Sequence, residues 1–292
     1  MKIKEFRNHF NKELSAIFPQ TEIDSFFFLL IEKELGLQRI DLALNTQTSI
    51  SDEKFKHLFN ALSRLKLQEP IQYILGETEF YGLPFMVTKN TLIPRPETEE
   101  LVDWVLEEVA KQQSGKVAKS LSILEIGTGT GCIPISLAKN LPNVTITAID
   151  ISSEAIKIAI QNADLNNVQI DFIEQDILTT KELPQQFDII VSNPPYVREL
   201  EKAEIQPNVL ENEPHLALFV EDNNPLLFYK KIAELAINHL IKKGVLFFEI
   251  NQYLGKETVE MLTEKGFITE LKKDVFGNNR MTKSTKTDFN KG

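Results

Sequence analysis

The sequence contains a single cysteine, Cys132, so no disulfide can form within the chain. A chain without disulfides suits a reducing compartment, and a cytoplasmic location is therefore expected. The longest apolar run, residues 26–31, is far shorter than the roughly 20 residues that a membrane-spanning helix needs. Residues 1–6 lack the apolar core of a signal peptide. We therefore expect no association with a membrane.

An excess of positive charge is also missing. The chain has 32 Lys and Arg against 42 Asp and Glu, which gives a formal net charge of −10. Sequence-independent binding of nucleic acid needs clustered Lys and Arg, so no direct nucleic-acid partner is expected. No His or Cys cluster has the spacing of metal ligands, and no metal is expected. Nothing in the sequence suggests a symmetric interface, so we expect a monomer.

The N-terminal part, residues 1–69, is predicted to form a small helical bundle. Its apolar side chains recur at spacings of three and four, as on one face of a helix. One of the predicted helices covers about 23–35 and ends at Gly36, a residue typical of the position after a helix. Another predicted helix begins after Ser51.

The sequence changes character at Pro70. Residues that favour β structure, from Tyr73 to Val87, are interrupted by Gly76 and Gly82. This pattern predicts a β-hairpin linker over residues 70–95.

Beyond this linker, predicted strands and helices alternate, which indicates an α/β domain with a doubly wound parallel sheet. The last ten residues, 283–292, are polar and are expected to fray. The predicted strands are 122–126, 144–150, 168–173, 187–192 and 244–250, and the predicted helices are 101–111, 133–141, 152–166 and 225–241.

A rigid turn, Asn193, Pro194, Pro195 and Tyr196, directly follows one predicted strand. Each proline fixes its φ angle and removes a backbone donor, so the carbonyl groups are held in a stiff frame. A free carbonyl and the Asn193 side-chain oxygen can together accept two hydrogen bonds from one NH2 group. Tyr196 can lie flat over a planar group. This 193–196 segment therefore predicts a clamp for a planar nitrogen, such as a side-chain amide or a base amine.

A glycine-rich turn lies at the first junction between a predicted strand and helix. Ligands of such sheets bind at the carboxyl ends of the strands, and glycines let them approach backbone N–H groups. A dinucleotide-binding pattern would need a glycine at Cys132, and the phosphate-loop pattern is also absent. The turn and the acid before it are Glu125, Gly127, Thr128, Gly129, Thr130 and Gly131.

Two more acids follow the next two predicted strands. Asp150 is placed to accept hydrogen bonds from both hydroxyl groups of a ribose. Asp176 is placed to accept one from an adenine amine, with Ile177 packing on the ring. A ligand held by carboxylates rather than by Lys and Arg is not expected to carry phosphate. S-adenosylmethionine fits, because it has a ribose, an adenine, an ammonium and a sulfonium group but no phosphate.

With these motifs the chain resembles the class I S-adenosylmethionine-dependent methyltransferases. More narrowly, it resembles the HemK/PrmC family, the glutamine-N5 methyltransferases of peptide-chain release factors. The resemblance covers nearly the whole chain. Its most specific parts are Ile-Pro-Arg-Pro-Glu-Thr-Glu at 93–99, the glycine turn at 127–131 and the 193–196 segment, and residues 70–76 and 213–218 are also similar to the family.

The resemblance implies a mostly parallel class I methyltransferase sheet with one antiparallel strand, over residues 96–292. It also implies that the helical bundle at 1–69 recognises the substrate. The implied partner is a class I peptide-chain release factor, whose Gly-Gly-Gln loop carries the glutamine that is methylated in support of translation termination. S-adenosylhomocysteine is the implied product of the cofactor.

The resemblance also implies roles for the 193–196 segment. Asn193 Oδ1 and the Pro194 carbonyl would accept the two N–H bonds of the glutamine amide, while Pro195 and Tyr196 pack on its plane. Asn193, Pro194 and Tyr196 are thus the expected catalytic residues, and Asn193 also borders the cofactor. No general base is assigned, because the proton can leave after methyl transfer.

The chain departs from the family at His215, Asn251 and Ile177, where the family commonly has Arg, Gly and an aromatic residue. An adenine-N6 methyltransferase of DNA or RNA is an alternative, because such enzymes use a similar clamp. That enzyme would be expected to carry a basic groove. An inert binding module is a second alternative, against which the intact glycine turn, Asp150 and Asn193 argue.

Overall fold

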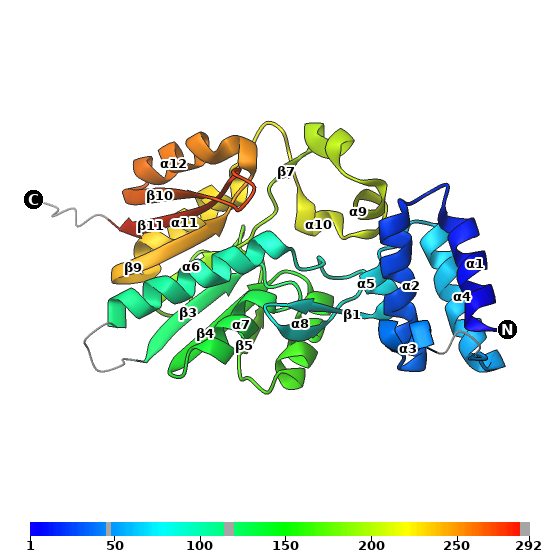
Figure 1. Ribbon diagram of the computed structural model, residues 1–292. Helices are drawn as coiled ribbons and strands as arrows, with labels where there is room; N and C mark the ends of the chain where they lie inside the picture. Colours follow the sequence, from blue (N-terminus) through cyan, green and yellow to red (C-terminus); the bar gives the residue numbers. More distant parts are fainter. Residues whose placement is uncertain (45–47, 114–119, 287–292) are drawn as a thin grey trace, which may run out of the picture. The chain divides into compact units, whose positions relative to one another are not determined.

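The computed structural model describes residues 1–44, 48–113 and 120–286 (Figure 1). The chain forms two compact units. The first consists of Met1–Gly76 and Gln206–Asn212, and the second of Glu77–Ile205 and the residues from Glu213 onward. Across the described ranges, no helix is both long enough and apolar enough to span a membrane.

The first unit is the predicted helical bundle. Phe6, Phe10 and Phe27 are fully buried at its centre, and the rings of Phe10 and Phe27 lie 5.7 Å apart. Helix α2 ends at Gly36, whose φ of 67° is left-handed, as predicted from the sequence. The helices of this unit are α1 (Ile3–Leu14), α2 (Gln20–Leu35), α3 (Arg39–Leu44), α4 (Asp52–Lys66), α5 (Ile71–Leu75) and α9 (Pro207–Asn212).

The β structure that was predicted from Pro70 begins only at Glu77. Residues Ile71–Leu75 form helix α5, which Gly76 ends with a φ of 74°. The prediction of β structure is wrong here because burial of Ile71 in the core of the bundle outweighs local β propensity. The hairpin itself is confirmed as β1 (Glu77–Phe80) paired antiparallel with β2 (Leu83–Met86).

The second unit is built on a seven-stranded sheet in the order β10-β11-β9-β6-β3-β4-β5. Strands β3, β4, β5, β6 and β9 run parallel, while β11 runs antiparallel to both of its neighbours. The predicted mostly parallel sheet with one antiparallel strand is therefore confirmed. The strands are β3 (Leu121–Ile126), β4 (Val144–Asp150), β5 (Asp171–Glu174), β6 (Phe187–Ser192), β9 (Leu240–Glu249), β10 (Phe267–Lys273) and β11 (Asn279–Lys286).

Helices cover both faces of this sheet (Figure 1). Ile123 and Phe247 point to one face and pack with α6 (Pro96–Gln113) and α7 (Cys132–Asn140). Their neighbours Leu124 and Phe248 point to the other face, because side chains alternate along a strand. The remaining helices are α8 (Ser153–Leu165) on the first face, α11 (Leu227–His239) and α12 (Gly255–Glu264) on the second, and α10 (His215–Leu218) at the edge that carries the site.

Strands β10 and β11 were not predicted, and the expected fraying of residues 283–286 is wrong because they belong to β11. Residues 287–292 lie outside the described part. Strand β11 consists mostly of polar residues and therefore lacks the apolar pattern that predicts a strand. Thr282 and Ser284 are nevertheless fully buried between β9 and β10. The Lys283 amine lies 5.4 Å from the centre of the Trp104 ring and 2.8 Å from Glu270 Oε2.

The order of the strands creates a switch point between β3 and β6. From β3 the chain proceeds outward to β4 and β5, and then crosses to β6 and β9 on the other side. Ile126 pairs with Ser192, whose hydroxyl donates to the Ile126 carbonyl at 2.6 Å. Ligands of open α/β sheets bind at such a point, beyond the carboxyl ends of the strands.

Trp104 is expected to be a main support of the sheet, because it packs edge-on against Phe247 and under Lys283. We predict that Trp104→Ala lowers the free energy of unfolding by about 3–5 kcal/mol, the usual cost of removing a buried aromatic side chain. Phe276 is 73% exposed. Its change to alanine is the control and should cost about 0.5 kcal/mol or less. Urea unfolding followed by far-UV circular dichroism measures both, and equal effects would contradict this role of Trp104.

Candidate active site

A cavity of about 230 Å3 lies in the second unit at the carboxyl ends of the parallel strands. Its walls come from the turn after β3, the ends of β4, β5 and β6, and helices α10 and α11. Many of the site residues predicted from the sequence meet there. These are Gly127, Gly129, Asp150, Asp176, Ile177, Asn193, Pro194 and Pro195.

The glycine turn is held in place by backbone and side-chain contacts. Gly127 has a φ of 82°, and a side chain there would approach the Asn193 carbonyl oxygen at 3.8 Å. At Gly131 a Cβ atom would lie 3.3 Å from the Cβ atom of Ala159 on α8, so glycine permits close packing. The backbone N–H groups of Gly127 and Thr128 both donate to the Ile149 carbonyl. The turn is thereby tied to the end of β4.

Asp150 connects the glycine turn to the next loop. Its Oδ2 accepts a hydrogen bond from the Gly129 N–H at 2.8 Å, and its Oδ1 accepts one from the Ser152 N–H at 2.9 Å. Burial raises the pKa of Asp150, although these backbone donors act in the opposite direction. Each oxygen keeps a lone pair that can accept a further donor from a ligand in the cavity.

The third acid, Asp176, follows β5 and also borders the cavity. Its Oδ1 accepts a hydrogen bond from the Leu178 N–H at 2.8 Å, and this bond does not involve Oδ2. Ile177 is buried and offers an apolar surface beside this carboxylate. A carboxylate next to an apolar wall can bind a flat group that has an amine on its edge.

The 193–196 segment is divided between the cavity and the protein core. Asn193, Pro194 and Pro195 line the cavity. Tyr196 packs against the core, and its hydroxyl donates to Glu249 Oε1 at 3.0 Å. Burial, together with the nearby charge of Glu249, raises the pKa of Tyr196. The Tyr196 hydroxyl therefore stays protonated at neutral pH.

Glu125 lies below the glycine turn. It is 1% exposed, and within the described part of the chain neither of its carboxylate oxygens has a hydrogen-bond partner. The same holds for the hydroxyl of Thr128. Burial, opposed by the nearby Thr128 hydroxyl and assisted by the charge of Asp150, raises the pKa of Glu125 well above its ordinary value. A buried acceptor without a donor is rare and points to a donor from outside the chain, such as water or a ligand.

Five predicted site residues do not line the cavity. They are Glu125, Thr128, Thr130, Gly131 and Tyr196.

Thr98 and Glu249 were not among the predicted site residues, although both are hydrogen-bonded to the 193–196 segment. Thr98, in the first turn of α6, donates from Oγ1 to Glu249 Oε2 at 2.7 Å, and Asn193 Nδ2 lies 3.3 Å from the same Oγ1. Thr98 and Glu249 are both buried. An acid that ends an otherwise apolar strand was a signal in the sequence that could have identified Glu249.

Residues 93–95 contact the loop that enters α10. The guanidinium of Arg95 donates to Glu213 Oε1 at 2.6 Å, and the Ile93 N–H donates to Glu213 Oε2 at 3.2 Å. The Glu213 side chain is almost fully buried. Segments 93–99 and 213–218, which were noted separately in the sequence, are therefore joined by an ion pair and a backbone hydrogen bond to Glu213.

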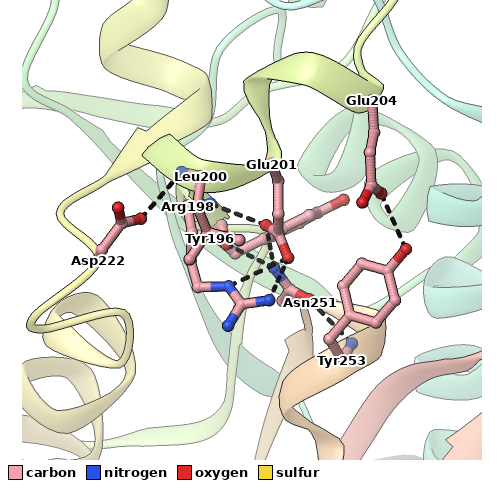
Figure 2. A network of polar contacts seen from close by, with 8 residues as sticks. All are labelled: Tyr196, Arg198, Leu200, Glu201, Glu204, Asp222, Asn251 and Tyr253. Carbon is pink, nitrogen blue, oxygen red and sulfur yellow. Dashed lines mark hydrogen bonds and ion pairs between the residues drawn. The ribbon is translucent and has the colours of Figure 1, made fainter.

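The three departures from the family pattern have defined surroundings. Ile177 is a wall of the cavity, and the ring of His215 meets that of Phe219 edge-on at 5.1 Å. Asn251 lies in a polar network behind the 193–196 segment (Figure 2). Its Nδ2 donates to the Tyr196 carbonyl at 2.9 Å and to Glu201 Oε2 at 2.8 Å. A glycine could make neither of these side-chain bonds.

Comparison with known proteins agrees with this architecture. Residues 5–76 match the PrmC N-terminal domain, and residues 105–217 match the methyltransferase small domain. A methyltransferase from Pyrococcus furiosus superposes with a TM-score of 0.50 at 16% identity, over 81% of this chain and 99% of that chain. At this identity the structural likeness shows the fold alone, and it confirms the predicted fold class.

Sequence relatives are much closer. The release factor glutamine methyltransferase of Flavobacterium psychrophilum is 58% identical over 97% of this chain and 99% of its own length. That of Bacteroides thetaiotaomicron is 42% identical over 94% of this chain and 96% of its own length. Because identity of this degree extends over both units, the chain belongs to the release factor glutamine methyltransferase family.

Proposed function

We propose that the protein transfers a methyl group from S-adenosylmethionine to the side-chain amide nitrogen of a glutamine in a peptide-chain release factor. The expected target is the glutamine of the Gly-Gly-Gln motif of class I factors. The observation that carries this proposal is a single cavity in which Asn193 and Pro194 face the same space as Gly127 and Asp150. A clamp for an amide and a site for a nucleoside-like cofactor are thereby next to each other.

The donors and acceptors at the cavity suit S-adenosylmethionine. Asp150 would accept hydrogen bonds from the ribose hydroxyls. Asp176 would accept one from the adenine amine, with the adenine ring packed against Ile177. The turn from Gly127 to Gly131 would lie along the cofactor. A cationic group of the cofactor near the unpartnered Glu125 would favour the charged form of that carboxyl group, which burial alone disfavours. When bound, this cofactor supplies an electrophilic methyl group and leaves as S-adenosylhomocysteine.

The chemical difficulty is the low reactivity of an amide nitrogen, because its lone pair is delocalised into the carbonyl. Asn193 Oδ1 and the Pro194 carbonyl would accept the two N–H bonds of the glutamine and aim its nitrogen at the methyl carbon. As the bond forms, positive charge develops on the nitrogen, and both acceptors stabilise that charge more strongly than the neutral amide. Fixed orientation adds a further advantage.

No side chain is needed as a base before transfer. The methylated nitrogen is strongly acidic and loses its proton afterwards to water or to an acceptor of the clamp. Tyr196 cannot accept this proton while its hydroxyl is protonated and bonded to Glu249. We infer that Pro195 and Tyr196 contribute by shape, through packing near the amide plane.

We further propose that the helical unit and the β1–β2 hairpin bind the release factor. The match of residues 5–76 to the PrmC N-terminal domain supports this assignment. The expected monomeric state stays a prediction, which light scattering after gel filtration tests.

The first prediction concerns the substrate. Incubation with methyl-labelled S-adenosylmethionine and a class I release factor should label the factor, whereas a factor with its loop glutamine replaced by alanine should stay unlabelled. An adenine-containing oligonucleotide is the control for the alternative reaction and should also stay unlabelled. Equal label in both release factors would refute the glutamine assignment.

The second prediction separates the cofactor site from the clamp. Asp150→Asn should raise the Kd for S-adenosylmethionine about 10–100-fold, because a hydrogen bond to a charged group is weakened. Asn193→Ala should lower kcat about 100–1000-fold, as loss of a transition-state hydrogen bond does. Its Kd for the cofactor should stay close to that of the wild type.

Isothermal titration calorimetry gives the two affinities, and single-turnover methylation gives the two rates. The assigned roles would be contradicted if Asn193→Ala weakened the binding of S-adenosylmethionine and Asp150→Asn slowed only methyl transfer.

A further inference from the structure

The hydrogen bonds behind Asn193 have a defined direction. A carboxylate only accepts hydrogen bonds, so the bond of 2.7 Å between Thr98 Oγ1 and Glu249 Oε2 uses the hydroxyl proton of Thr98. Toward Asn193, 3.3 Å away, Thr98 Oγ1 then offers only a lone pair. A lone pair attracts the NH2 end of the Asn193 amide and repels its oxygen end.

We propose that Thr98 and Glu249 are positioning residues that select one of the two orientations of the Asn193 side-chain amide. With Nδ2 held by Thr98, Oδ1 is the end left to accept a hydrogen bond in the cavity. The reversed orientation would offer the glutamine an NH2 donor, which cannot accept an N–H bond. This inference rests on the proposed function for its catalytic consequence, while the orientation itself is independent of it.

Rigid elements hold the two positioning residues. Thr98 lies in α6 and Glu249 ends β9, and both are almost completely buried. Glu249 accepts a second hydroxyl donor at Oε1, from Tyr196. Burial is the main reason that the pKa of Glu249 is raised, and the charge of Glu97 acts in the same direction. The hydroxyl donors of Thr98 and Tyr196 and the positive charge of Arg280 oppose this effect and favour the acceptor-only carboxylate.

The same carboxylate also connects the two ends of the 193–196 segment. It reaches Asn193 through Thr98 and contacts the Tyr196 hydroxyl directly. Two residues after Glu249, Asn251 donates a hydrogen bond to the Tyr196 carbonyl (Figure 2). The rigid frame that the prolines provide in the backbone is therefore extended to the side chain of Asn193.

The variants that test this proposal keep the shape of the site. Thr98→Val removes the hydroxyl, Thr98→Ser keeps it, and Glu249→Gln replaces one acceptor oxygen by an NH2 donor. Thr258→Val is the matched control. Thr258 is fully buried in α12, and its hydroxyl donates to the Leu254 carbonyl rather than to a residue of the site.

In steady-state methylation of a release factor by the full chain, Thr98→Val should lower kcat about tenfold, the equivalent of one hydrogen bond. KM for the release factor and Kd for S-adenosylmethionine should change little. Thr98→Ser should restore most of the rate, and Thr258→Val should leave it unchanged. Glu249→Gln should also lower kcat, and its combination with Thr98→Val should be no slower than the slower single variant, because both act on one orientation.

A second measurement separates this proposal from the proposed function. In protein labelled with 15N-asparagine, the side-chain NH2 signal of Asn193 is assigned by its loss in Asn193→Asp. Its hydrogen exchange in the free protein should be slow in wild type and Thr98→Ser and about tenfold faster in Thr98→Val, the effect of losing one hydrogen bond.

Unchanged exchange in Thr98→Val, or equal loss of rate in Thr98→Ser and Thr98→Val, would overturn the positioning role. Absence of methylation by the wild type, with the predicted exchange differences intact, would refute the function and leave the orientation supported.

Discussion

The site depends on the parallel pairing of β3 and β6 at the centre of the sheet. Because both strands run the same way, their carboxyl ends emerge side by side, and the bond from Ser192 to the Ile126 carbonyl joins the last paired residues. The glycine turn and the 193–196 segment begin at the next residues. A ligand near Gly127 is consequently also near Asn193, although 65 residues of chain lie between Gly127 and Asn193. No loop has to move for the two motifs to meet.

The carboxylates of Asp150, Glu249 and Glu125 near this edge have different hydrogen-bond environments. Asp150 has two backbone donors and Glu249 has two hydroxyl donors, and in both cases these donors favour the charged form against the effect of burial. Glu125 has no donor within the described residues, and burial raises its pKa the most clearly of the three. The first two act as fixed acceptors that organise the protein, whereas Glu125 is the acceptor that a cationic ligand would complete.

Elements with one apolar face were predictable, and elements stabilised by polar contacts were not. The bundle helices and the parallel strands follow the spacing of their apolar residues. Strand β11 has few apolar residues, and it is buried because its backbone pairs on both sides and Lys283 lies by Trp104. Helix α5 has residues that favour strands, but it packs in the bundle core. In both cases a tertiary contact outweighs the local preference.

The family, the doubly wound sheet and eight of the residues that line the cavity could be predicted from the sequence, because glycines, prolines and acids at strand ends have strong local preferences. Which of the predicted residues face the cavity depends on the folded arrangement. Tertiary structure turned Tyr196 toward Glu249, placed Glu125 beneath the turn, and brought Thr98 to Asn193 from 95 residues away. The direction of a hydrogen bond depends on the donors and acceptors that surround it. Those surroundings come from helix α6 and strand β9, which are distant in the sequence and adjacent only after folding.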